Sequence, residues 1–464
     1  MNIISLFNSF CNHLNNILDN NLSFHELECK IADSTYSLNL DVLKEILEYI
    51  DLLYKHSKER KDLYYVKETR SRTLITSLGL ISFRKTYYIS KQKVNGKYHF
   101  FSYLEDYLGI DKWAKMTLKA EVNLISSSLD NGMSWASLNA IPGYVTTRQT
   151  ISKKIKSINY NYDYNISKVE DTPNTIYIEA DEVHSHLQSR TKGKKNRIVP
   201  VILIHEGHKE DVVRKKQLSN KHYIASSILK TDKLWNEAFN YIDLKYDINK
   251  IKYLFISGDG GSWIKQYLEA FPNAIYVYDK FHYRKLLNYI FKKDPLKTKF
   301  ADQYLRNKMI CEFKLLVKAQ ADLYPNQRKY IFKNMNTLLN NIEGILNQNH
   351  PKYKCPCSME GTISNYYARF LTSRPHAYSP DGLENTVQLL TLKANNIKLT
   401  EELYHQFKYG ISTYKQLNLE KFITNFRLQS NQIYKNIDST HSVDNSNFNL
   451  KDNYRLDFFL NHRL

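Results

Sequence analysis

The sequence predicts a multidomain α/β protein whose catalytic-type core is a mixed β-sheet covered by helices. Residues 174–282 have the pattern of three consecutive strands followed by alternating helices and strands, an order that produces a mixed sheet. Residues 283–350 are almost wholly helical, which indicates an all-α insertion. The chain has 464 residues, too many for one compact core, so two to four domains are expected.

The composition favours a folded protein with a polyanionic partner. Hydrophobic residues make up 42% of the chain, which supports a packed core, and the formal net charge is +19. Such a charge suits nucleic acid or an anionic membrane surface, although the richness in Lys, Asn, Ile and Tyr also follows from AT-rich codons. No apolar run approaches the ~18–20 residues that span a bilayer, so we expect no membrane partner.

The cysteines indicate a reducing compartment, and the N-terminal segment agrees with it. The N-terminal segment has no basic leader, long apolar stretch or small-residue cleavage site, so it is not expected to be a secretory signal. Five cysteines are too few, and odd in number, for a disulfide framework. We therefore expect a cytoplasmic, nucleoid-associated protein.

The N-terminal region is predicted to be helical over 1–65 and to carry a β-hairpin within 66–110. Apolar residues between 43 and 53 recur at helical spacing, whereas 72–92 is rich in β-branched and aromatic residues around a turn at Ser77–Gly79. The second arm of the hairpin carries a basic–aromatic strip. Either this strip contacts DNA or it is an ordinary solvated face; its residues are Arg84, Lys85, Tyr87 and Tyr88.

A candidate helix–turn–helix lies in the helical region 111–170. A short helix over 135–140 meets a Pro-Gly turn, and Thr146 or Thr147 then caps a second helix. The first turns of that helix present side chains suited to base edges and phosphates, which favours DNA binding over plain helical packing. The candidate DNA contacts are Arg148, Gln149 and Lys153.

The predicted catalytic core covers 171–282 and 351–427. Strands are expected over 175–187, 197–207, 215–226, 251–261 and 273–282, with helices over 232–246, 262–271 and 357–371. A basic turn before the second strand adds three candidate DNA contacts, Lys194, Lys195 and Arg197. Expected core positions of the insertion are Leu286, Ile290, Leu315, Leu316, Leu338 and Leu339, and residues 428–464 are predicted to be a polar flexible tail.

Three carboxylates occupy positions that suit metal-assisted phosphodiester chemistry. Asp181 lies in the first strand, on the same face as Glu179, because side chains alternate along a strand. Asp259 directly follows an apolar strand and is flanked by glycines, and Glu360 opens the helix after the insertion. Taken singly, Asp259 also suits a plain turn and Glu360 an ordinary first-turn acid. Together they favour a site for Mg²⁺, which prefers oxygen ligands.

These residues lie in motifs that resemble one known family, the ISLre-type insertion-sequence transposases of low-GC bacteria. The similar pieces spread over 68–379, and their order is more specific than any single motif. They are ETRSRTLITSLGLISFRKTYY, YLEDYLGI, IYIEADEVHSHLQ, ISGDGGSWIK, YDKFHYRKLL and CSMEGTISNYYARFLTSRPHAYS.

The resemblance implies a DDE transposase with a ribonuclease-H-like core, in which two Asp and one Glu hold catalytic metal ions. In that fold the first Asp lies on the first strand, the second follows the fourth strand, and the Glu sits on a late helix. The matching residues are Asp181, Asp259 and Glu360, with Glu384 the rival for the third position. Asp279 and His282 resemble an accessory pair of the family, although capping or packing explains His282 equally well.

The resemblance also implies two Mg²⁺ or Mn²⁺ ions, DNA as substrate at both element ends and target, and a homo-oligomer on DNA. The implied chemistry is direct transesterification, in which water nicks the element end and the freed 3′-hydroxyl attacks target DNA. One departure from the family pattern is Glu182, which stands where Gly is expected after the first Asp.

Other classes are less well supported. A decayed or repurposed DNA-binding protein of the same ancestry would use the hairpin and the helix–turn–helix without strand transfer. A tyrosine recombinase is disfavoured because no His is followed three residues later by Arg, and a P-loop ATPase because no Gly-Lys-Ser/Thr occurs. Zinc at His350, Cys355, Cys357 and His376 is disfavoured by the Cys-Pro-Cys spacing.

Overall fold

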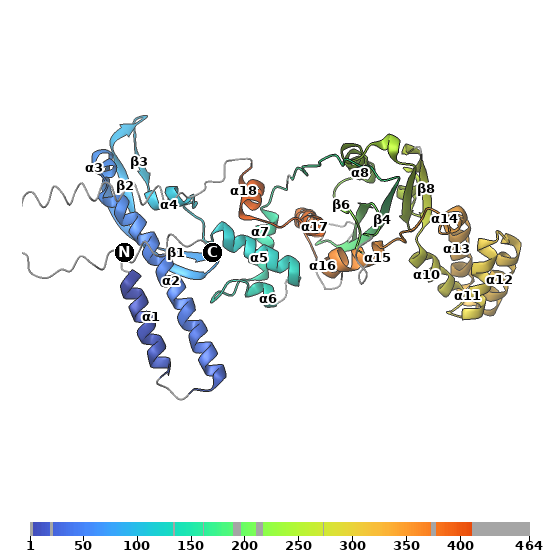
Figure 1. The fold of residues 1–464 in the computed structure, drawn as a ribbon, viewed down its shortest axis with the longest axis horizontal. Helices are drawn as coiled ribbons and strands as arrows, with labels where there is room; N and C mark the ends of the chain where they lie inside the picture. The colour runs from blue at the N-terminus through green and yellow to red at the C-terminus, as the bar shows by residue number, and fades with distance from the viewer. Residues whose placement is uncertain are drawn as a thin grey trace, which may run out of the picture. The chain divides into compact units, whose positions relative to one another are not determined.

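The computed structural model describes residues 3–18, 22–132, 135–160, 162–188, 196–209, 217–271, 273–372 and 377–410 (Figure 1). The predicted DNA contacts Lys194 and Lys195 and the predicted tail at 428–464 lie outside the described residues. The described chain divides into two compact units, one ending at Lys115 and the other beginning at Met116.

Unit 1 packs helices against a three-stranded antiparallel sheet of order β1-β2-β3. Leu47 and Ile50 of the long helix meet Ile81 and Phe83 of the hairpin in one buried cluster. The hairpin closes through the two residues between Thr76 and Gly79, which pair with each other. The elements are α1 (Ile3–Leu18), α2 (Phe24–His56), α3 (Lys58–Leu63), β1 (Tyr64–Thr76), β2 (Gly79–Val94), β3 (Lys97–Phe101) and α4 (Tyr103–Leu108).

The basic–aromatic strip predicted on the hairpin is only partly at the surface. Arg84 is exposed, whereas Lys85 is 4% exposed and its ammonium group pairs with Glu105, as does the buried guanidinium of Arg72. Burial, reinforced by repulsion from Arg72, lowers the pKa of Lys85 to about 8. The prediction that Lys85 contacts DNA is wrong, because its charge is compensated inside unit 1.

Unit 2 is built on a mixed five-stranded sheet of order β6-β5-β4-β7-β8, which confirms the predicted mixed sheet. β4 pairs antiparallel with β5 and parallel with β7, β5 pairs antiparallel with β6, and β7 pairs parallel with β8. The third strand is shorter than predicted. The strands are β4 (Thr175–His186), β5 (Asn196–His205), β6 (His222–Ala225), β7 (Tyr253–Gly258) and β8 (Ala274–Tyr278).

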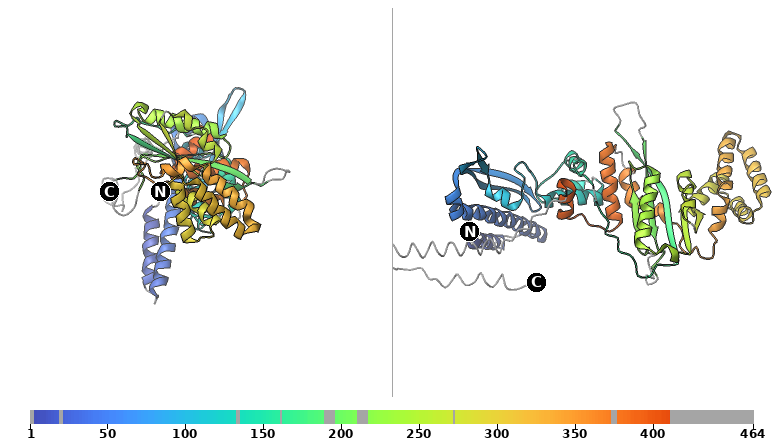
Figure 2. Two further views of the ribbon diagram at one scale, coloured as in Figure 1. Left: turned by 90° about the vertical axis from the view of Figure 1, so that its right-hand side faces the viewer. Right: turned by 90° about the horizontal axis from the view of Figure 1, so that it is seen from above.

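Alternation along β4 separates two cores on opposite faces of the sheet. Figure 2 gives two further views of the ribbon. Ile176, Ile178 and Ala180 point to a cluster that includes Trp235 of α8 (Thr231–Lys245). Val183, on the other face, belongs to a cluster formed with α17 (Pro380–Ala394) and other helices. Residues 177, 179 and 181 share the face of Val183 by the same alternation.

The predicted all-α insertion is present beyond β8 and has its own core. Ile290 and Leu338 are fully buried there, but Leu315 is 66% exposed, so its predicted core position is wrong. The last helix protects the edge of β8, because Asn347 and Gln348 donate side-chain hydrogen bonds to its carbonyls, at 2.9 and 2.8 Å. The helices are α10 (Lys280–Ile290), α11 (Pro295–Arg306), α12 (Ile310–Leu323), α13 (Arg328–Leu339) and α14 (Ile342–Asn347).

The remaining helices flank the sheet or precede it. The helix predicted over 357–371 begins at Met359 and contains a π-helical segment, Ile363–Ala368. The helix predicted over 262–271 is shorter than expected and consists of α9 followed by a 3₁₀ turn. Among the described residues, no helix combines the length and apolar character that crossing a membrane requires. These helices are α5 (Leu118–Asn131), α6 (Trp135–Leu138), α7 (Arg148–Lys156), α9 (Ser262–Lys265), α15 (Met359–Thr362), α16 (Arg369–Leu371) and α18 (Glu401–Tyr409), with 3₁₀ turns at Ile248–Lys250, Leu268–Ala270 and Pro325–Gln327.

The buried ion cluster of unit 1 predicts a large stability effect. Glu105→Ala leaves Arg72 and Lys85 buried without their carboxylate, so we expect unit 1 to lose about 3–5 kcal/mol of unfolding free energy. Urea unfolding of the full chain measures this loss. The control is Glu68→Ala, which breaks an exposed 2.9 Å pair with Arg70 and should cost less than about 1 kcal/mol. Equal losses for the two variants would refute the compensating role of Glu105.

Candidate metal centre

Three aspartates follow mutually paired positions on three parallel strands. Ala180 of β4 pairs with Gly258 of β7, which pairs with Tyr278 of β8, and the next residue along each strand is an aspartate. These are Asp181, Asp259 and Asp279. Because the three strands are parallel and adjacent, the aspartates lie in one row across the sheet. The backbone N–H of Asp279 extends the row by donating to the Gly258 carbonyl at 2.9 Å.

The glycines around Asp259 are required by close backbone approach. A Cβ on Gly258 would lie 2.8 Å from the Ala180 carbonyl oxygen and 2.5 Å from Ile264 Cδ1. Gly260 adopts φ +88°, a left-handed conformation that side-chain-bearing residues rarely adopt. The ISGDGG segment thus brings β7 against β4 and turns sharply beyond Asp259, whose Oδ1 accepts the Gly261 N–H at 2.9 Å.

The tightest group of potential metal ligands draws on three separate elements. One ligand atom from each of Asp181, His282 and Glu360 lies within 4.8 Å of the other two. Asp181 comes from β4, His282 from α10 and Glu360 from α15. No other group of three His, Cys, Asp or Glu side chains meets this spacing in the described part of the chain. Residues far apart in the sequence therefore converge on one point.

Electrostatics favour a cation at this point. Burial, together with the negative charges of Asp259 and Glu360, raises the pKa of Asp181 to about 6. Burial also raises the pKa of Asp279, and burial followed by repulsion from Asp259 raises that of Glu182. A divalent cation bound among these partly buried carboxylates would relieve their mutual repulsion.

His282 is positioned by the turn that precedes it. Asp279 caps α10 by accepting the Phe281 N–H at 3.1 Å, and His282 Nδ1 lies 3.7 Å from Asp279 Oδ2. That nitrogen is buried and finds no hydrogen-bond partner among the described residues. An imidazole with a buried nitrogen that makes no hydrogen bond, on a side chain grouped with two carboxylates, fits a metal site. His282, which the resemblance of the motifs suggested as an accessory residue, thus belongs to the group with Asp181 and Glu360, and Asp259 is not a member of that group.

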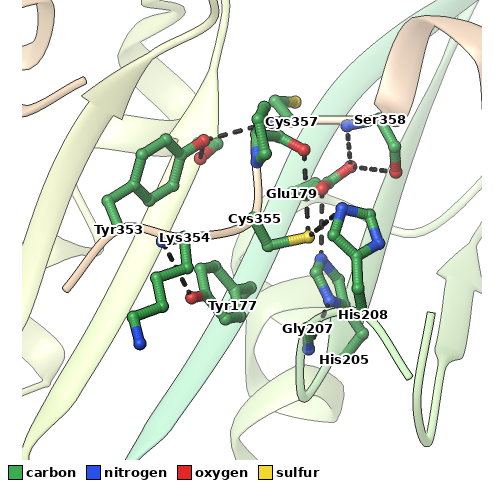
Figure 3. A network of polar contacts seen from close by, with 12 residues as sticks. Tyr177, Glu179, His205, Gly207, His208, Tyr353, Lys354, Cys355, Cys357 and Ser358 are labelled. Atoms are coloured by element: carbon green, nitrogen blue, oxygen red, sulfur yellow. Dashed lines mark hydrogen bonds and ion pairs between the residues drawn. The ribbon is translucent and has the colours of Figure 1, made fainter. Parts of the chain in front are cut away.

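Glu179 connects the strand of Asp181 to the helix of Glu360. Figure 3 shows its carboxylate between His205 of β5 and Ser358, the residue before α15. Oε2 accepts both the backbone N–H and the hydroxyl of Ser358, at 2.8 and 3.0 Å. Glu179 precedes Asp181 by two residues, and Ser358 precedes Glu360 by two. The contact therefore fixes the position of α15, the helix that carries Glu360, relative to Asp181 on β4.

His205 completes this connection in a defined tautomer. Its Nδ1 accepts the Gly207 N–H at 3.0 Å, which leaves the ring hydrogen on Nε2. Nε2 then donates to Glu179 Oε1 at 3.1 Å. Glu179 is 1% exposed and His205 is fully buried, so the carboxylate has protein donors on both oxygens in place of water.

The segment before Glu360 is also fastened to the sheet by two tyrosines (Figure 3). The Tyr353 hydroxyl accepts the Cys357 N–H at 3.1 Å and lies 3.2 Å from Ser257 Oγ on β7. The Tyr177 hydroxyl of β4 accepts the Lys354 N–H at 3.3 Å. The chain returning from the insertion is thus held against both strands that bear the first two aspartates.

The rival carboxylate Glu384 lies elsewhere. Its Oε1 accepts the Ser226 hydroxyl at 2.9 Å, and its Oε2 accepts the Ser227 N–H and hydroxyl at 2.6 and 2.7 Å. Both serines follow β6, which is two strands away from β4. Glu384 therefore satisfies a buried loop and does not join Asp181.

Among the described residues, His350, Cys355 and Cys357 do not come together as a group of potential metal ligands. Cys355 Sγ lies 3.3 Å from His208 Nε2, and His350 Nδ1 accepts the Lys352 N–H at 3.2 Å. His376 lies outside the described residues.

The remaining DNA-contact candidates have mixed positions. Arg148, Gln149 and Lys153 are exposed on α7, whose N-cap is Thr147 through a 3.1 Å bond from the Thr150 N–H. Buried Ile151 and Ile155 pack the opposite side of that helix into the core. Arg197 is exposed at the start of β5, and its Nε donates to the Ser227 carbonyl at 2.6 Å.

Sequence reasoning missed the role of Glu179. The sequence placed it on the face of Asp181 but gave it no partner, because Ser358 is 179 residues away. The available signal was the matched spacing: a polar residue precedes each ligand by two positions.

Comparison with known proteins identifies relatives along most of the chain. The model of the uncharacterised protein family UPF0236 matches residues 17–406. One UPF0236 protein of Caldanaerobacter subterraneus subsp. tengcongensis is 27% identical over 410 residues, covering 86% of this chain and 84% of the relative. A second from that organism is 28% identical over 392 residues, covering 83% and 81%. The names of these two relatives join eleven and four locus labels, respectively.

The Glu179 connection predicts an effect on metal affinity without direct ligation. The Glu179→Gln variant places an amide N–H against a donor of His205 or Ser358, so we expect α15 to shift. The affinity for Mn²⁺, measured by titration calorimetry, should then fall about 10-fold or more. The matched control is Glu384→Gln, an equally hydrogen-bonded buried carboxylate away from the centre, whose Mn²⁺ affinity should stay within about twofold. If both variants bind Mn²⁺ as the wild type does, Glu179 is not a positioning residue.

Proposed function

This chain belongs to the uncharacterised protein family UPF0236, and from its candidate metal centre we propose that it is a transposase that cleaves DNA and transfers the cleaved strand. The observation that carries the proposal is the convergence of Asp181, Glu360 and His282, with Asp259 alongside, at one end of a mixed sheet. Phosphodiester chemistry with metal ions needs such converging oxygen ligands.

The order of the elements supports a ribonuclease-H-like core of the ISLre type. Within the sheet, the first strand in sequence, β4, carries Asp181, and the fourth, β7, is followed directly by Asp259. Glu360 lies on the late helix α15, after the all-α insertion. These are the positions that the resemblance of the motifs assigns to the two Asp and the Glu of a DDE transposase.

The names of the relatives add independent support for a mobile element. The name of one relative joins eleven locus labels, as expected of a protein that is encoded at several places in one genome. An insertion sequence that has copied itself leaves this pattern, whereas an ordinary housekeeping enzyme does not require it.

The residues present fit Mg²⁺ or Mn²⁺ as the cofactor. Asp181, Glu360 and His282 would hold one ion. Asp259 and Asp279, which lie in one row with Asp181, would contribute to a second ion. The carboxylates of the group suit both Mg²⁺ and Mn²⁺. When bound, such ions supply Lewis-acid stabilisation of the charge that develops on the phosphate being cleaved.

The chain's own residues supply the rest of the site. Glu179 orients Glu360 toward Asp181 through Ser358, and Asp279 holds the turn that delivers His282. On α7, exposed Arg148, Gln149 and Lys153 are suited to duplex DNA, because a helix presenting cations and amides fits the major groove. Binding of two element ends by a homo-oligomer is part of the same proposal.

The test is metal-dependent nicking of DNA that carries the inverted repeats flanking the gene. Wild-type protein should nick these ends with Mn²⁺ or Mg²⁺ and not with EDTA. Asp181→Asn, Asp259→Asn and Glu360→Gln should each lower the rate about 100-fold or more while DNA binding is retained. The matched control is Glu343→Gln, which removes a 75% exposed carboxylate on α14 and should not change the rate.

The competing function gives a different result. If the chain is a decayed or repurposed DNA-binding protein, the wild type and Asp181→Asn should bind the element ends equally well. Neither protein should nick them. Glu182, which stands at a position where the resemblance leads us to expect Gly, is the feature that motivates this alternative.

A further inference from the structure

A continuous stripe of exposed side chains runs along α10 beside the candidate metal centre. Its members recur at helical spacing and line a shallow surface groove of about 670 Å³. All of them are exposed. The stripe consists of Phe281, Arg284, Lys285, Asn288, Tyr289, Lys292 and Lys293.

The groove is strongly cationic and contains two exposed aromatic rings. Four of its seven lining residues are Lys or Arg, and none is acidic. Phe281 is 45% exposed and Tyr289 44% exposed. Lys285 lies 5.6 Å from the Phe281 ring and Lys292 lies 4.8 Å from the Tyr289 ring. Each ring thus has a cation beside it, which is the combination that binds a phosphate and stacks its base.

The backbone at the end of α10 supports a binding role for the last two lysines. Lys292 and Lys293 adopt φ +54° and +63°, a left-handed conformation that costs free energy for a residue with a side chain. Lys292 also donates to the Gln327 side chain, which fixes its position over the Tyr289 ring. Both lysines line the groove, at positions where glycine would avoid this cost.

The stripe leads directly to the metal centre. Its first member, Phe281, donates its backbone N–H to Asp279 and stacks edge-on against His282, with ring centroids 5.4 Å apart. From Phe281 to Tyr289 the helix rises about 12 Å, so the groove extends over several nucleotides from the centre.

We propose that this groove binds an unpaired DNA strand and leads it to the metal centre, an inference that rests on the proposed function. A duplex buries the faces of its bases, whereas an unpaired strand offers both phosphates and base faces. The alternation of cations with exposed rings matches the unpaired strand, because electrostatic contacts track the backbone while bases stack on the aromatic rings.

The experiment measures strand binding separately from cleavage. Fluorescence anisotropy would follow a labelled mixed-sequence oligonucleotide binding to Asp181→Asn protein in EDTA, where no cleavage takes place. The two test variants are Arg284→Ala/Lys285→Ala and Phe281→Ala/Tyr289→Ala. The matched controls, exposed side chains of the same insertion outside the groove, are Lys314→Ala/Lys318→Ala and Phe300→Ala/Tyr330→Ala.

Both test variants should lose about 10-fold or more in affinity for the unpaired strand, and both controls should stay within about twofold. For the charge variant, the slope of log affinity against log salt should fall by about 1.4, roughly 0.7 for each phosphate contact removed. Circular dichroism should match that of the Asp181→Asn parent, because every further substituted residue is exposed.

Several outcomes would overturn the inference. One such outcome is that the groove variants keep both their affinity for the unpaired strand and its salt slope. Another is that the variants lose affinity for duplex DNA only. A third is that the wild type binds RNA 10-fold or more tightly than the unpaired DNA strand. A change in oligomeric state without a change in strand binding would assign the groove to a protein partner. If the wild type fails to nick DNA but the groove variants still lose strand binding, the groove assignment stands and the proposed catalysis fails.

Discussion

The parallel pairing of β4 with β7 is the interaction on which the site depends. Ala180 and Gly258 are paired partners, and the absence of a Cβ on Gly258 lets the neighbouring carbonyl and Ile264 approach it. This register sets Asp181 beside Asp259, and the further pairing with β8 adds Asp279, which starts α10. A one-residue slip would turn Asp181 to the opposite face, into the core beneath α8.

A buried carboxylate then joins the two halves of the core. The all-α insertion separates the strands from α15 in sequence, so hydrogen bonding between neighbouring residues cannot align Glu360 with Asp181. Glu179 does so, through Ser358 on one oxygen and the neutral ring of His205 on the other. Because an unpaired buried carboxylate is costly, the alignment is strongly specified once these partners are present. The basic residues Arg284 and Lys285 of α10, the helix that carries His282, are exposed.

Sequence patterns predicted local features well and long-range placement less well. The succession of strands and helices along the chain, the hairpin turn and the cap of α7 follow from periodicity, turn residues and capping, which depend on neighbouring residues. Lys85 and Leu315 were misplaced for one reason: the alternation or periodicity of an element does not reveal which face its neighbours cover. Lys85 turns toward Glu105 and the interior, whereas Leu315 lies on an outer face of α12.

The sequence by itself determined that Asp181 lies in a strand, that Asp259 follows another beside glycines, and that Glu360 opens a late helix. Only the tertiary structure decided which of these carboxylates meet. It grouped Asp181 and Glu360 with His282, left Asp259 beside them, and used Glu384 to satisfy the loop after β6. The physical reason is that strand register and the Glu179 contact act between residues distant in sequence, and neither leaves a periodic signal in it.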